Sequence, residues 1–254
     1  MHFFEKVTSN NITYKPDSNL DSLANELELD KGTVDSKTLS WGNVFTSHYT
    51  WGYTQIYEKY MSAFRESSLP ITFFEIGIAD PRFAFGSIKL WLSYFKNINL
   101  YCLDNFDNET NGITVMNNIQ TVTTLGANFF YGNQGVKEDW DFIENRLRNS
   151  VDFLVEDGSH TSHHMMYSLW RSIPLLKSGA YYFMEDIQDP VSMFGPSNVD
   201  VYHTLVNFKN TGKFISSVIS EQACRDIERA FDVVEMYVGG QEHTKIQMCV
   251  LKKK

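Results

Sequence analysis

The sequence predicts an α/β fold with a mostly parallel sheet and one antiparallel edge. Three observations support this: short apolar runs alternate with stretches of helical periodicity, polar residues follow each apolar run, and a pair of strand-like segments follows the alternating part. Buried parallel strands are continuously apolar because helices cover both of their faces. The 254 residues are 43% hydrophobic and 21% charged, which is typical of a folded domain with a well-buried core.

The elements follow in order along the chain. Residues 1–40 are polar and weakly periodic, so we expect an irregular arm with a short helix near 21–29. Apolar side chains at helical spacing predict a helix over 53–64, which the segment 67–70 ends. Five strands are predicted in the alternating part, at 71–76, 99–103, 128–131, 151–155 and 180–184. Helices are predicted between or after them at 87–95, 136–147 and 166–173. The rest of the chain is predicted to form a helix at 222–230 and two strands at 233–238 and 245–251.

Charge and composition narrow the possible functions. The chain has 22 Lys and Arg against 31 Asp and Glu, a net charge of −9, which argues against sequence-independent binding to nucleic acids. No stretch approaches the roughly 20 apolar residues that span a bilayer, and residues 1–9 carry no apolar signal core, so we expect a cytoplasmic protein without a membrane partner. Cys102, Cys224 and Cys249 are widely spaced and fit reduced thiols.

Polar residues follow the predicted strands, at the edge where open parallel sheets bind ligands. Glu75 lies at the end of the first strand and Gly77 follows it, and glycine there lets the backbone approach a ligand closely. Asp104 follows the second strand, where a carboxylate can accept hydrogen bonds from ribose hydroxyls. Simple turns explain these residues too. The segment FEIGIAD lacks the G-x-G-x-x-G spacing, which counts against a nicotinamide cofactor.

Three carboxylates follow the fourth and fifth strands: Asp157, Glu185 and Asp186. Crowded carboxylates raise each other's pKa unless a cation neutralises them, and oxygen ligands suit a hard divalent ion such as Mg²⁺, Mn²⁺ or Ca²⁺. His160 lies three residues beyond Asp157 and could take a proton from an acceptor hydroxyl. The structural alternative is a helix cap at Asp157 and a solvated loop at 185–186.

Five segments in this order resemble the class I S-adenosylmethionine-dependent methyltransferases: FFEIGIAD, YCLDNF, FYGNQG, DFLVEDGSH and YYFMEDIQDP. The likeness is strongest to the metal-dependent sugar O-methyltransferases of the mycinamicin type, and cephalosporin-hydroxylase-like and rhamnosyl O-methyltransferase proteins share the same core. Residues 30–60 also resemble that family's N-terminal segment, and the resemblance covers 27–189. Two departures are Glu156, where the family has a second Asp, and the loop 79–86, which has fewer glycines.

The resemblance implies a Rossmann-like, mostly parallel seven-stranded sheet with an antiparallel C-terminal strand. It also implies that residues 1–66 form an N-terminal arm that includes a helix, and that residues 67–254 form a methyltransferase domain. The implied cofactors are S-adenosyl-L-methionine and Mg²⁺, and the implied reaction is O-methylation of a sugar or another small polar acceptor, phosphorylated or not.

Residue roles follow by position. The resemblance assigns His160 as general base and Asp157 as a second catalytic residue. Lys31 and His48 match the N-terminal pattern near the cofactor or acceptor. The implied metal ligands are Asp157, Glu185 and Asp186, and the implied cofactor-binding residues are Glu75, Gly77, Asp104, Gln134, Thr33 and Tyr49.

Two other classes of function stay open. His160 with Asp157 or Glu185 could be part of a non-haem iron oxidoreductase site. A non-catalytic, cofactor-binding subunit is the other alternative. The aromatic face over 53–64 would serve an interface between copies as well as a core, so a homo-oligomer is compatible with the sequence.

Overall fold

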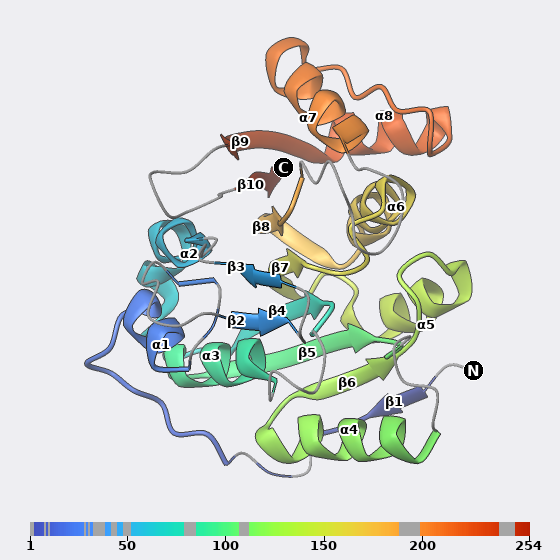
Figure 1. Cartoon of the computed structure of the whole chain (residues 1–254). Helices are drawn as coiled ribbons and strands as arrows, with labels where there is room; N and C mark the ends of the chain where they lie inside the picture. The colour runs from blue at the N-terminus through green and yellow to red at the C-terminus, as the bar shows by residue number, and fades with distance from the viewer. Residues whose placement is uncertain are drawn as a thin grey trace.

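The computed structural model describes residues 3–7, 9, 11–27, 29, 31–32, 39–41, 45–47, 52–78, 85–106, 112–187, 199–238 and 247–254. Within these residues, an eight-stranded sheet runs through the molecule with helices on both faces (Figure 1). Its order is β1-β6-β5-β4-β7-β8-β10-β9. The strands are β1 (Phe3–Glu5), β4 (Ile71–Ile76), β5 (Ile98–Asp104), β6 (Asn128–Tyr131), β7 (Val151–Glu156), β8 (Leu176–Met184), β9 (Phe231–Val238) and β10 (Gln247–Lys253).

Two layers of helices bury the two faces of the sheet. The described helices are α1 (Leu20–Glu26), α2 (Tyr53–Met61), α3 (Gly86–Tyr94), α4 (Gly112–Leu125), α5 (Lys137–Leu147), α6 (Ser162–Ser172), α7 (Val199–Thr211) and α8 (Glu221–Ala230), with a short 3₁₀ turn, η1, at Ser62–Phe64. Side chains of α1 to α4 share one hydrophobic core with one face, and side chains of α5 to α8 share a second core with the other. Tyr57 and Trp91 pack edge to face in the first core, and Trp140 is fully buried in the second.

Five central strands are parallel, so their carboxyl ends lie along one edge. The pairs β4–β5, β4–β7, β5–β6 and β7–β8 are parallel, whereas β1, β10 and β9 pair antiparallel. Ile76 is level with Glu156, and Glu156 is level with Met184. The residues that follow these three strand ends therefore emerge side by side.

The predicted mostly parallel sheet with an antiparallel C-terminal edge is confirmed, and the described sheet has one strand more than predicted. The additional strand is β1, which pairs with β6 through Phe3↔Tyr131, Phe4↔Phe130 and Glu5↔Phe129. A second small sheet joins β2 (Leu39–Trp41) to β3 (Phe45–Ser47). The short helix expected near 21–29 is α1.

Two further observations bear on the sequence-based expectations. The described helices include none that is long and apolar enough to cross a membrane. Cys102, Cys224 and Cys249 are all buried, free thiols.

Candidate functional site

The site lies where the strand order reverses, between β4 and β7. Chain order runs β4, β5, β6 towards one edge, and β7 then pairs with the other side of β4. Open parallel sheets bind ligands in the crevice beyond such a reversal. The backbone ladder continues past the strand ends, because the amide of Asp157 donates to the carbonyl of Ile76 at 2.9 Å and the amide of Gly77 donates to Leu103 at 2.9 Å.

Gly77 permits this close approach. Its φ is +78°, and a Cβ at this position would lie 2.1 Å from the carbonyl oxygen of Asp157. Only glycine combines that backbone conformation with the absence of a side chain. At the predicted glycine turn after β4, the backbone of Gly77 therefore packs directly against the backbone of the loop that follows β7.

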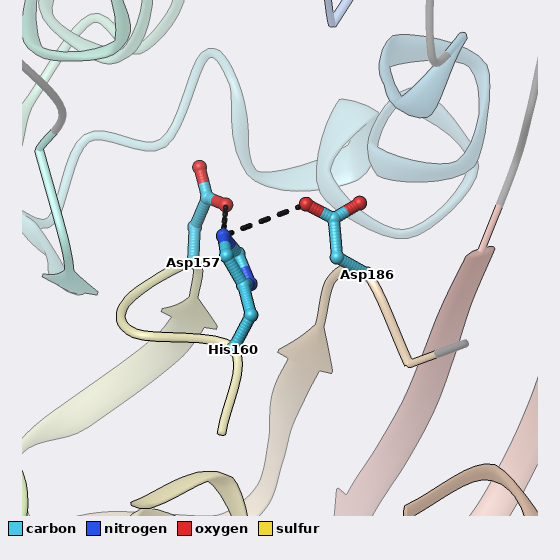
Figure 2. Close-up of side chains that lie close together, drawn as sticks. All are labelled: Asp157, His160 and Asp186. Atoms are coloured by element: carbon cyan, nitrogen blue, oxygen red, sulfur yellow. Dashed lines mark ion pairs between the residues drawn. The ribbon is translucent and has the colours of Figure 1, made fainter. Parts of the chain in front are cut away.

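Asp157, His160 and Asp186 converge beyond β7 and β8 (Figure 2). The Nε2 atom of His160 lies 3.7 Å from Oδ1 of Asp157 and 3.6 Å from Oδ2 of Asp186. One ligand atom from each residue falls within 4.8 Å of the others. Among the described residues this group holds one histidine and two carboxylates, whereas non-haem iron oxygenases use two histidines and one carboxylate.

Backbone strain accompanies this convergence. His160 has φ +54° and Asp186 has φ +52°, in the left-handed region that non-glycine residues enter at a cost. Such residues persist only where surrounding contacts hold them, and they concentrate at functional sites.

Gln134 supplies one of those contacts for the loop that carries His160. Its Oε1 accepts the amide of Ser159 at 2.8 Å, and its Nε2 donates to Glu156 at 2.8 Å and to Ser168 at 3.1 Å. The side chain is buried, and its own carbonyl accepts from the indole of Trp140 at 2.8 Å. Gln134 therefore holds the loop in place through these hydrogen bonds. The resemblance assigned Gln134 to the adenine side of the cofactor, and that role stays a prediction.

Glu185 contacts residues of the N-terminal arm. Oε2 of Glu185 lies 2.6 Å from Nζ of Lys31, which also lies 2.7 Å from Oδ2 of Asp157. Two tyrosines of α2 reach the same carboxylates: Tyr57 donates to Glu185 and Tyr53 donates to Asp186. Helix α2 therefore contacts both Glu185 and Asp186, through two tyrosines four residues apart.

Burial and crowding shift the pKa values of these groups. Burial raises the pKa of Glu185 well above its ordinary value, and Asp157 adds to the rise while Lys31 opposes it. Burial and Asp157 likewise raise the pKa of Asp186 against the pull of His160. For His160, burial lowers the pKa, but the charges of Asp186 and Asp157 outweigh it, so the net pKa is raised.

The first two strand ends hold buried or backbone-bonded carboxylates. Glu75 is fully buried, accepts from Ser87 at 3.0 Å, and burial raises its pKa from 4.5 to about 7. Asp104 accepts the amides of Ile78 at 3.0 Å and Phe106 at 2.7 Å. Asp104 thus anchors the chain where it leaves both strands, and its assignment to the ribose stays a prediction.

The structure brings most of the predicted residues to one edge. Thr33, Tyr49 and His48 lie outside the described residues. Sequence reasoning placed Lys31 only near the cofactor or acceptor and did not single out Tyr53 and Tyr57 as site residues. The i, i+4 spacing of those two tyrosines was a usable signal, because it puts both hydroxyls on one helix face.

Comparisons with known proteins identify chains of similar sequence and fold. No protein-family model matches the chain. It is 27% identical over 144 residues to 8-demethyl-8-alpha-L-rhamnosyl tetracenomycin-C 2'-O-methyltransferase of Streptomyces olivaceus, covering 54% of this chain and 34% of that protein. It is 26% identical over 138 residues to mycinamicin VI 2''-O-methyltransferase of Micromonospora griseorubida, covering 53% of this chain and 31% of that protein. The chain thus spans about a third of the length of the curated relatives it matches.

Solved structures extend the likeness over nearly the whole chain. The MycE methyltransferase from the mycinamycin biosynthetic pathway, in complex with Mg, SAH and mycinamycin VI, aligns with a TM-score of 0.61 at 20% identity, covering 94% of this chain and 54% of that chain. A crystal form of the same methyltransferase with Mg and SAH gives a TM-score of 0.60 at 19% identity, covering 93% and 54%. The resemblance predicted from the motifs is therefore confirmed: the chain is similar in sequence to sugar O-methyltransferases and has the fold of a class I methyltransferase of the mycinamicin type.

Proposed function

We propose that this protein is a Mg²⁺-dependent O-methyltransferase that uses S-adenosyl-L-methionine to methylate a hydroxyl of a sugar or another small polar acceptor. The observation that carries the proposal is the convergence of Asp157, His160 and Asp186 at the reversal of strand order. The acceptors named for the curated relatives support a sugar-bearing small molecule.

The donor atoms of the site fit a hard divalent ion. Carboxylate oxygens of Asp157 and Asp186 lie within reach of one ion, and Glu185 is a third carboxylate that Lys31 joins to Asp157. Mg²⁺ prefers oxygen ligands and binds through one or two carboxylates with the remaining positions open to water or substrate. Asp157, Glu185 and Asp186 are therefore the residues that would hold the ion.

The first strand end fits the methionine end of the cofactor. Oε1 of Glu75 is buried and has no hydrogen-bond partner among the described residues, so it can accept a bond from an ammonium group. Gly77, two residues after Glu75, has no side chain to cover the backbone there. Asp104 lies at the end of the next strand, where a ribose would follow the methionine moiety.

The proposed chemistry divides between the bound groups and the chain. When bound, S-adenosylmethionine would supply the methyl group, whose bond to sulfur is exchanged for a bond to the acceptor oxygen, and Mg²⁺ held by the carboxylates would supply Lewis-acid chemistry. His160 is placed to accept the hydroxyl proton at Nε2. A bound cation would compensate the charges of Asp157 and Asp186 that raise the pKa of His160, which favours the neutral form that a base requires.

We further propose that residues 1–66 form an arm that completes the site of a methyltransferase domain over 67–254. The arm supplies Lys31, Tyr53 and Tyr57, which contact the carboxylates directly. These residues cover the side of the carboxylate group that faces the arm.

Binding and turnover test the proposal. Calorimetric titration with S-adenosylhomocysteine should give stoichiometric binding, and methyl transfer to rhamnosylated aglycones should stop in excess EDTA. Asp157→Asn should abolish Mg²⁺-dependent turnover. Asp152→Asn makes the same change at the other end of β7, where the carboxylate pairs with Lys177, and should retain turnover. Absence of S-adenosylhomocysteine binding would refute the proposed function.

The base is tested by His160→Asn, because asparagine tolerates the positive φ of that position better than most residues. Loss of general-base catalysis should lower kcat by about 10²–10⁴-fold. The affinity for S-adenosylhomocysteine should stay unchanged. A kcat equal to that of the wild type would remove His160 from the mechanism.

A further inference from the structure

Lys31 is a buried lysine inside the carboxylate group. Its side chain is 7% exposed, and Nζ lies 2.7 Å from Asp157 and 2.6 Å from Glu185. Lysines are almost never buried unless a partner compensates their charge. This one has two carboxylate partners, from the ends of two adjacent strands.

The arm holds Lys31 in this position through its backbone. The carbonyl of Lys31 accepts the amide of Thr54 at 3.0 Å, and the carbonyl of Gly32 accepts the amide of Gly52 at 3.0 Å. The hydroxyl of Thr54 donates to Asp21 in α1 at 2.6 Å. The lysine is therefore fixed between α1 and the first turn of α2 and aimed at the strand ends.

The oxygens of the three carboxylates are divided between two directions. Oδ1 of Asp157 and Oδ2 of Asp186 face His160. Both oxygens of Glu185 contact the arm: Oε2 pairs with Lys31 and Oε1 accepts from Tyr57. Glu185 is consequently absent from the group of described ligand atoms that lie within 4.8 Å of one another.

We propose that Lys31 is an internal cation that competes with the divalent ion for Glu185 and Asp157. This inference rests on the proposed function only in that the site takes a divalent ion. Glu185 can join the ligands of that ion only by releasing Lys31, because the ammonium occupies the oxygen that would face it. Metal loading is therefore linked to the position of residues 31–32 in the arm.

Electrostatics gives the direction of the effect. Clustered buried carboxylates need a positive charge, and either the ammonium or the metal ion can supply it. An ammonium at hydrogen-bond distance from two of the ligands opposes a divalent cation at the same place. Removing the lysine charge should therefore strengthen metal binding while it weakens the metal-free fold.

Titration of the protein with MgCl₂ alone tests the proposal. Lys31→Met and Lys31→Gln should bind Mg²⁺ about tenfold more tightly than the wild type, or tighter still, because the competing charge is gone. Both variants should melt at a lower temperature in EDTA and gain more in Tm from Mg²⁺ than the wild type does. Lys31→Arg keeps the charge and should show no gain in affinity.

Two controls make the result specific. Lys15→Met removes an exposed arm lysine that pairs with Glu26, and its Mg²⁺ affinity should equal that of the wild type. Adding Glu185→Gln to Lys31→Met should abolish the gain. Unchanged or weaker Mg²⁺ binding by both Lys31 variants, with binding by the wild type intact, would overturn the inference alone. Absence of Mg²⁺ binding by every protein would overturn the metal dependence of the proposed function as well.

Discussion

Glu75 makes the stability of the metal-free protein depend on pH in a direction opposite to that of most acidic residues. The carboxyl is fully buried, and burial raises its pKa from 4.5 to about 7, with Lys31 opposing and Asp157 adding to the rise. Because the folded state binds this proton more tightly than the unfolded state does, Glu75 stabilises the fold below pH 4.5. That contribution is lost as the pH rises towards 7.

The size of the effect follows from the shift. A difference of 7 − 4.5 = 2.5 pKa units corresponds to about 3 kcal/mol at 1.36 kcal/mol per unit. Glu75→Gln has the shape of the protonated carboxyl and does not titrate. The free energy of unfolding of Glu75→Gln relative to the wild type should therefore rise by about 3 kcal/mol between pH 4.5 and pH 8.

Urea denaturation in EDTA at several pH values measures this difference directly. Glu138→Gln, at an exposed position in the first turn of α5, removes the same charge and should show no comparable dependence. The reasoning is refuted if the difference between Glu75→Gln and the wild type is the same at pH 5 and pH 8, or falls as the pH rises.

Two further predictions concern the framework of the site. Gln134→Leu removes two buried hydrogen bonds and one partly buried one, and should lower the free energy of unfolding by about 2–4 kcal/mol in urea titrations. Gln222→Leu, at an exposed position, should be nearly neutral. An equal loss in both variants would contradict the bracing role. Gly77→Ala should lower both Tm and affinity for S-adenosylhomocysteine, because its Cβ would lie 2.1 Å from the carbonyl oxygen of Asp157. Gly212 has a similar φ of +71°, but a Cβ there would meet open space. Titration calorimetry of Gly212→Ala should therefore give an unchanged affinity for S-adenosylhomocysteine, and differential scanning calorimetry should give a smaller loss of Tm than for Gly77→Ala.

The central strands could be predicted because the hydrophobic pattern that identifies each strand lies within its own few residues. A strand buried on both faces is mostly apolar, and 71–76 and 151–155 are predominantly apolar, with Glu75 and Asp152 as the charged exceptions. Polar residues directly after such strands must lie on one edge when the strands are parallel. The neighbourhood of Asp157 and Asp186 follows from those two facts.

Other elements were not predictable because tertiary contacts decide them. Helix α4 is rich in threonine, valine and isoleucine, which are weak helix formers, and it is held by buried residues such as Ile119 and Val122. Strand β1 has three residues, and only its pairing with β6 makes it a strand. The position of Lys31 at the carboxylates leaves no periodic signal in the sequence.

The ion pairs of Lys31 also constrain when, during synthesis of the chain, the carboxylate group can acquire its lysine partner. Its partners Asp157 and Glu185 lie 126 and 154 positions further along the chain. During translation, the lysine therefore remains hydrated until β7 and β8 have left the ribosome. Burying Lys31 before then would leave its charge without these two partners. The two ion pairs that hold Lys31 at the site can therefore form only after residue 185 has been synthesised.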